Sequence, residues 1–115
     1  MQIHVAQADA HMVVTLVGAA EGRGADELGK ALASAHEQAV AAAVREVVVD
    51  LRDLEFATSS ALKAFVTWLQ GVHELAAEAR YRVVFQSTPR HPWQGRSLHA
   101  LKAFAGDVME IREVA

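Results

Sequence analysis

The chain has no cysteine, no excess of basic residues and no long apolar run. The absence of cysteine excludes disulfides, thiolate metal ligands and a cysteine nucleophile, and it is typical of a reducing compartment. With 11 Lys and Arg against 14 Asp and Glu, the formal net charge is -3, which does not favour nucleic-acid binding. No apolar stretch approaches the roughly 18 residues of a membrane span, and residues 1–5 lack the order of a signal peptide. We therefore expect a cytoplasmic protein that neither enters a membrane nor binds nucleic acid.

The motifs of common catalytic and metal sites are also missing. Glycines at positions 18, 22 and 24 lie close together, but neither a GxGxxG pattern nor a phosphate-loop lysine accompanies them. The six histidines form no HExxH or His-x-His pair. Asp50 is either a catalytic carboxylate or, the interpretation we favour, a strand-end residue that bonds loop N–H groups; the acidic residues after it have no metal-ligand spacing. We expect no enzymatic activity, no cofactor and no metal.

What the chain has in quantity is apolar residues, 52% of 115. A chain of this length and composition can bury its own core, and we expect one domain over residues 1–115. The periodicity predicts a strand-strand-helix-strand-helix-strand-helix-strand order. The strands are expected at 2–6, 12–17, 47–51, 81–85 and 108–114, and the helices at 25–44, 59–78 and 93–105. This order predicts an α/β fold with a mixed, mostly parallel sheet layered with helices.

Three local patterns refine this prediction. The apolar run 47–51 does not alternate, which is typical of a strand covered on both faces. The helix at 25–44 has an apolar face of Leu and small Ala residues, so it can approach a sheet closely. The helix at 59–78 repeats apolar residues at helical spacing, and Trp68, three residues after Phe65, is expected to be partly exposed, as in a contact surface.

The junction between the strand at 47–51 and the following helix is the most informative segment. Ser59 and Ser60 stand at a helix start, where unpaired backbone N–H groups attract anions. The structural interpretation is that Thr58 or Ser59 caps the helix and that Ser60 lies in its first turn. The functional one is a hydroxyl that is phosphorylated or read by a partner.

A second unusual segment opens the third helix. Arg90 and Arg96 flank Trp93, and Arg and Trp are frequent at interface hot spots. Two interpretations are open. The segment docks an anion or a partner near the serine site, since both helices begin at the same edge of the sheet. Alternatively, Trp93 packs between helix and sheet, and the arginines lie at the surface.

The element order and the junction together resemble the STAS domain family, the sulfate transporter and anti-sigma factor antagonist domains. In the antagonist branch the junction usually reads Asp-Leu-Ser-x-Val-x-Phe-x-Asp-Ser-Ser-Gly-Leu, and residues 50–62 keep its spacing without a gap as DLRDLEFATSSAL. The second serine of the family pair is the phosphoacceptor of a serine kinase that is also an anti-sigma factor, and this role maps onto Ser60. Two positions depart from the pattern: Thr58 replaces the aspartate, and Ala61 replaces the glycine.

The resemblance implies an α/β fold of the STAS type, with a small mixed sheet and helices mainly on one face. It also implies a non-enzymatic regulatory module that docks an anti-sigma factor or serine kinase and is released when Ser60, or less favourably Ser59, is phosphorylated. The expected interface consists of Glu55, Phe56, Thr58, Ser59, Ser60 and Lys63, with Arg90 and Trp93 as further members. Some lone STAS domains are instead subunits of ABC-type lipid transport complexes and steady the ATPase without phosphorylation. A third alternative is a sensor that binds a nucleotide or lipid in the crevice between sheet and helix.

Overall fold

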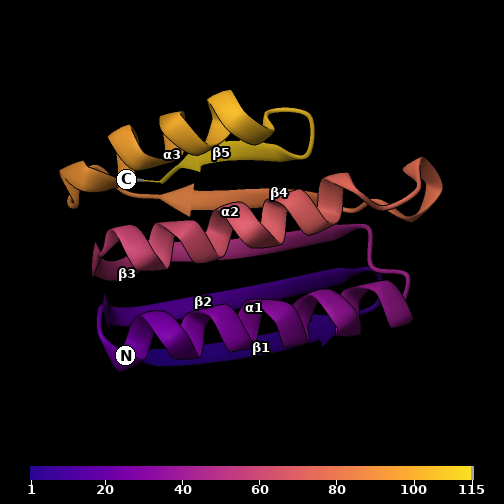
Figure 1. Cartoon of the computed structure of the whole chain (residues 1–115), viewed down its shortest axis with the longest axis horizontal. Coiled ribbons are helices and arrows are strands. Elements are labelled where there is room, and N and C mark those ends of the chain that lie inside the picture. The colour runs from indigo at the N-terminus through magenta and orange to yellow at the C-terminus, as the bar shows by residue number, and fades with distance from the viewer. Residues whose placement is uncertain (115) are drawn as a thin grey trace.

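The computed structural model describes residues 1–114 and confirms the predicted element order (Figure 1). The sheet contains five strands in the order β1-β2-β3-β4-β5. In chain order the elements are β1 (Gln2–Ala8), β2 (His11–Ala20), α1 (Arg23–Ala41), β3 (Glu46–Ala57), α2 (Ser59–His73), the short 3-10 helix η1 (Ala77–Ala79), β4 (Arg82–Ser87), α3 (Pro92–Ala105) and β5 (Met109–Glu113).

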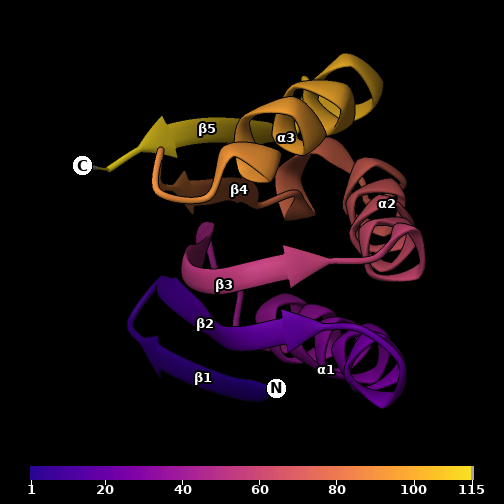
Figure 2. The ribbon, with the colours of Figure 1, turned by 90° about the vertical axis from the view of Figure 1, so that its left-hand side faces the viewer.

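The sheet is mixed, as predicted. Strands β1 and β2 form an antiparallel hairpin, whereas β2-β3, β3-β4 and β4-β5 pair in parallel. The hairpin turns at Asp9, whose φ of 55° is left-handed, a conformation that Asp tolerates better than most residues. Each parallel connection carries one of the three main helices, and all three lie on one face of the sheet (Figure 2).

The core therefore forms between one face of the sheet and the helices. Along β3, Val47, Val49 and Leu51 are buried against the helices, while Val48 and Asp50 between them are only partly covered. The prediction that this strand is covered on both faces is wrong. Its apolar run reflects the β-branched preference of strands, and its opposite face has no helix above it.

Two strands are longer than the sequence predicted. The sequence predicts that these strands end at residues 17 and 51, but β3 continues to Ala57 and pairs with the end of β2, which runs through Gly18 to Ala20. The register between the two strands shifts on either side of Gly18, and Gly18 has a φ of 102° that other residues rarely adopt. Pairing with a neighbouring strand here overrides the local signal for a loop.

Helix α2 is shorter than predicted, ending at His73 rather than at residue 78. The guanidinium of Arg80 folds back and donates hydrogen bonds to the carbonyls of His73 (2.6 Å) and Leu75 (3.1 Å). It thereby satisfies carbonyl groups that the end of a helix leaves without a partner. The other element boundaries differ from the prediction by no more than three residues.

Within the part of the chain that the structure describes, no helix combines the length and the apolar character needed to cross a bilayer.

Candidate functional site

The start of α2 is fastened by Thr58. The residue is extended (φ -75°, ψ 169°), and its hydroxyl oxygen accepts the backbone N–H of Ala61 at 3.3 Å, which makes it the helix N-cap. Thr58 also ties the helix to the end of β2: its N–H and its hydroxyl both donate to the carbonyl of Ala20, at 3.0 and 3.3 Å. The position that departs from the family pattern therefore has a structural task.

Ser59 and Ser60 are the first two residues of α2, and both are exposed. Because Thr58 caps the helix, neither serine hydroxyl is needed for that task. Ala61 directly after them is fully buried, so it anchors the first turn under the sheet edge while the hydroxyls face outward. Thr58 is therefore the helix cap, as the structural interpretation predicts, and the Ser60 hydroxyl takes no part in capping.

Ser60 borders an open hollow of about 560 Å³ between α1 and α2. Two cations line the same hollow, Lys30 from α1 and Lys63 from one turn further along α2, together with the anion Asp26. The positive ends of the helix backbone and the two lysines make this an environment that favours an added negative charge near Ser60.

The remaining predicted residues of this surface come from the end of β3. Glu55 and Phe56 are exposed, Phe56 by 49%, and Lys63 is exposed on α2. This end of β3 therefore exposes an apolar ring beside charged side chains. The structure thus brings Glu55, Phe56, Thr58, Ser59, Ser60 and Lys63 together around one strand-to-helix junction.

The predicted second segment lies at the start of α3, on the same edge of the sheet as the start of α2 (Figure 1). Arg90 is exposed, and its guanidinium donates to the Thr88 hydroxyl and to the carbonyl of Arg52, both at 3.4 Å. Trp93 is half-buried and packs against the core, and its buried indole Nε1 has no hydrogen-bond partner within residues 1–114. The hydrogen bonds of this segment run to β3, not to α2.

Gln94 is the residue at this edge that the sequence analysis missed. Its side chain is fully buried; it accepts the N–H of Thr88 at 2.9 Å and donates to the carbonyls of Leu51 (2.6 Å) and Leu54 (3.0 Å). It precedes Leu98 by four residues and so extends the buried stripe of α3. The four-residue spacing to Leu98 indicates a buried position, but a glutamine is not expected on the apolar face of a helix.

The prediction that Asp50 is a strand-end residue bonding loop N–H groups is wrong, because β3 continues for seven more residues and the partner of Asp50 lies within the strand. Its carboxylate is held by the side chain of Arg52, at 2.9 Å from both Nε and Nη2, and by the Arg52 backbone N–H at 3.1 Å. These bonds from Arg52 lower the pKa of Asp50 below its ordinary value. The carboxylate of Asp50 is therefore one half of an ion pair with Arg52.

No group of three or more His, Cys, Asp and Glu residues that could hold a metal ion occurs in the described part of the chain.

Trp68 was expected at the surface, and this prediction is wrong. Its side chain is 5% exposed and its indole Nε1 donates to the hydroxyl of Tyr81 at 2.7 Å. Trp68 follows Phe65 by three residues and precedes Val72 by four, all three of which are buried. The helical spacing of these residues was enough to place the indole in the core.

A five-stranded mixed sheet with helices on one face, carrying an exposed serine pair at the start of its second helix, defines an α/β domain of the STAS type. The family model described as "Mlab, STAS domain" matches residues 3–102, and the chain belongs to this family. No curated protein gives a significant match to the chain.

Three solved structures share the fold. The first is an anti-sigma factor antagonist from Mycobacterium paratuberculosis, with 22% identity and a TM-score of 0.66, over 96% of this chain and 84% of that one. The anti-sigma factor antagonist SpoIIAA in its unphosphorylated form has 13% identity and a TM-score of 0.59, over 99% and 88% of the two chains. The Bacillus cell fate determinant SpoIIAA in its phosphorylated form has 14% identity and a TM-score of 0.64, over 96% and 90%. At these identities the likeness concerns the fold.

Proposed function

We propose that the chain is a non-enzymatic regulatory module of the anti-sigma factor antagonist type, which acts in the cytoplasm by docking a protein partner. The docking surface is the strand-to-helix junction formed by Glu55, Phe56, Thr58, Ser59, Ser60 and Lys63, flanked by Arg90 and Trp93. Its partner is an anti-sigma factor or a serine kinase, and phosphorylation of Ser60 releases the complex.

The observation that supports this proposal is that the residues which hold the start of α2 are different from the serines which are exposed there. Thr58 supplies the N-cap and the buried Ala61 supplies the anchor. The exposed Ser60 hydroxyl can therefore be modified without disturbing either contact. A kinase needs such an accessible hydroxyl, and a partner that docks on this surface contacts the Ser60 hydroxyl directly.

Electrostatics explain how modification would act on the partner and not on the fold. A phosphoryl group adds about -1.5 to -2 charges. At a helix N-terminus this charge is favourable by about 0.3–1 kcal/mol, and Lys30 and Lys63 line the same hollow. A docked partner that covers Ser60, in contrast, would bury the dianion, which is costly without new ion pairs.

A second candidate function, a subunit that steadies the ATPase of an ABC-type lipid transport complex, is favoured by two residues. Thr58 stands where antagonists have aspartate, and the buried Ala61 stands where they have glycine. Both changes maintain the helix start while removing the acidic side chain expected beside a phosphoacceptor. Docking in this case uses the same junction without modification.

The test is affinity capture from the native cell with four baits: wild type, Ser60→Asp, Ser60→Ala and Ser59→Asp. The proposal expects wild type and Ser60→Ala to retain one kinase-type partner, and Ser60→Asp to lose it. Ser59→Asp adds the same charge at the neighbouring, equally exposed residue of the docking surface, so it separates the two serines: the proposal expects a larger loss of the partner with Ser60→Asp than with Ser59→Asp.

The captured partner is then purified and incubated with ATP and each variant, and intact mass is measured. The proposal expects a single phosphoryl addition on wild type and none on Ser60→Ala. Equal addition on Ser60→Ala, or equal capture by wild type and Ser60→Asp, contradicts the switch. Capture of an ABC-type ATPase by all four baits supports the second candidate.

A further inference from the structure

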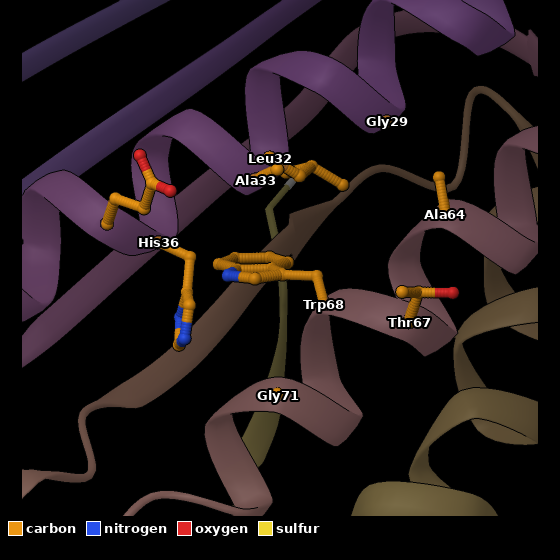
Figure 3. A pocket seen from close by; sticks show the side chains of 9 residues that line it. Gly29, Leu32, Ala33, His36, Ala64, Thr67, Trp68 and Gly71 are labelled. Carbon is orange, nitrogen blue, oxygen red and sulfur yellow. The ribbon is translucent and has the colours of Figure 1, made fainter.

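A second pocket between α1 and α2 adjoins the hollow at Ser60, with which it shares Gly29, Ala64 and Thr67, and has Trp68 against it (Figure 3). Its volume is about 380 Å³, within the range of about 300–1,000 Å³ typical of small-molecule sites. The pocket exists because small residues occupy the facing stripes of the two helices, at positions where larger side chains would fill the space. These residues are Gly29 and Ala33 on α1, and Ala64 and Gly71 on α2.

A chain of hydrogen bonds fixes the polar group that this pocket presents. Trp68 Nε1–H donates to the Tyr81 hydroxyl at 2.7 Å, and the same hydroxyl lies 2.6 Å from His36 Nδ1. Burial raises the pKa of Tyr81, so the hydroxyl retains its single proton. The indole N–H of Trp68 can only donate, so among the described residues His36 Nδ1 is the one neighbour able to accept the proton of the buried Tyr81 hydroxyl. Because an unpaired buried O–H is costly, we assign Nδ1 as the acceptor.

A neutral imidazole that accepts at Nδ1 carries its proton on Nε2. His36 is half-buried and lines the pocket. Its Nε2 has no hydrogen-bond partner within residues 1–114 and faces Gly71, where an added Cβ would lie 3.7 Å from it. The site therefore offers an aromatic wall, several small apolar residues and one N–H donor held in a fixed direction.

We propose that this pocket binds a small planar heteroaromatic molecule that carries a hydrogen-bond acceptor on its edge. The ring lies against Trp68, between the small residues of the two helices, and its acceptor receives the Nε2–H of His36. Aromatic contacts of this kind add to the benefit of burial. Glu37, exposed at the same pocket, disfavours an anionic ligand. This site does not depend on Ser60 or on the proposed partner.

The experiment uses isoquinoline, a neutral bicyclic probe with a ring-nitrogen acceptor, and indole, a probe of similar shape whose nitrogen is a donor. Each is titrated into the full chain, and amide and indole N–H shifts are followed by NMR. We expect isoquinoline to give saturable shifts at Trp68 Nε1–H and at the Gly29 and Gly71 amides. Indole is expected to bind about fivefold more weakly, the effect of one hydrogen bond. In His36→Phe the two probes should bind equally.

Gly71→Ala is the blocking variant. Its methyl group fits at ordinary contact distance from His36 Nε2 and fills the pocket, while alanine strengthens a helix relative to glycine. Gly95→Ala in α3 is the matched control, because its methyl group meets no atom within 4 Å. Both variants are expected to melt at or above the wild-type temperature, but only Gly71→Ala should lose isoquinoline binding.

Ala33→Leu blocks the pocket from the other helix, and it provides the same test should Gly71→Ala fold poorly. The proposal is overturned if isoquinoline gives no saturable shift at the pocket, if both blocking variants bind as wild type does, or if indole binds as tightly as isoquinoline.

Discussion

The helices α2 and α3 begin at the same edge of the sheet but in opposite ways. The α3 start directs its first-turn glutamine inward, where Gln94 joins three backbone groups of β3 and the loop after β4. At the α2 start the half-buried Thr58 caps the helix and the buried Ala61 anchors its first turn, while the two serines are exposed. The start of α3 connects neighbouring elements through buried hydrogen bonds, whereas the start of α2 exposes two hydroxyl groups to solvent.

The comparison teaches how one sheet edge can serve both stability and regulation. An added charge is tolerated only where solvent or a helix N-terminus can stabilise it. Because α3 carries the buried connections, α2 can expose modifiable groups without loss of the fold. Substitutions at the two starts are expected to differ in size accordingly.

Gln94→Ala should have the largest effect. It removes three buried hydrogen bonds and leaves the N–H of Thr88 and the carbonyls of Leu51 and Leu54 without this partner. The expected loss is about 3 kcal/mol of unfolding free energy, measured by urea denaturation followed by circular dichroism. A loss below about 1 kcal/mol would show that water replaces the side chain and that the two helix starts are alike.

Thr58→Ala should have an intermediate effect. Loss of the N-cap is expected to reduce the unfolding free energy by about 1 kcal/mol. Thr58→Asp is the informative partner variant, because aspartate caps a helix at least as well and restores the acidic residue of the family pattern. An ionised aspartate cannot donate to the Ala20 carbonyl as the Thr58 hydroxyl does, so this variant should unfold at a urea concentration between those of Thr58→Ala and wild type. An Asp variant as unstable as the Ala variant would contradict this account of the cap.

Asp50→Asn tests the charged pair on β3, away from both helix starts. The loss at pH 7 is expected to be about 0.5 kcal/mol or less, as for a solvent-screened pair. Because Arg52 lowers the pKa of Asp50 in the folded chain, the pair's contribution is fully present above the unfolded pKa of about 4 and is lost as the pH falls through the lower, folded pKa. Urea denaturation at descending pH should therefore show the gap between variant and wild type closing below about pH 4; a gap that widens there would contradict the sign.

Ser60→Asp should have the smallest effect on stability. The introduced carboxylate lies at an exposed helix start, so the unfolding free energy should stay within about 0.5 kcal/mol of wild type. Urea denaturation of wild type, Ser60→Asp and Gln94→Ala side by side gives the comparison directly. A Ser60→Asp variant that is as unstable as Gln94→Ala would contradict the proposal that the starts of α2 and α3 differ in their tolerance of substitution.

The sequence predicted those features that depend on local periodicity. The element order, the mixed sheet and the helix start at Ser59 follow from apolar spacing and from residues that favour helix starts. The extension of β3 could not be predicted this way, because its polar residues pair only when β2 lies beside them. The end of α2 depends similarly on Arg80, seven residues beyond the helix.

The candidate site was predictable in part. The exposure of Ser60 follows from its place in the first turn, whereas the choice of Thr58 as the cap needed the backbone geometry. Gln94 and the Tyr81 hydroxyl were missed because their partners are distant in sequence, on β3 and on α1 and α2. Periodicity places such residues in the core, but it does not say which polar groups they meet there.

The strand order has a consequence for how the chain assembles. Every strand pairs with the strand directly before it in the chain, so the sheet can be extended one strand at a time, as each hairpin or strand-helix-strand unit closes. Only the β1-β2 hairpin pairs residues that are close in sequence, whereas each parallel pairing spans a helix, as between Met12 and Val47. Such long-range pairing is associated with slower folding. The ends of the chain lie on the two outer strands, at opposite edges of the sheet (Figure 1), and folding does not require them to meet.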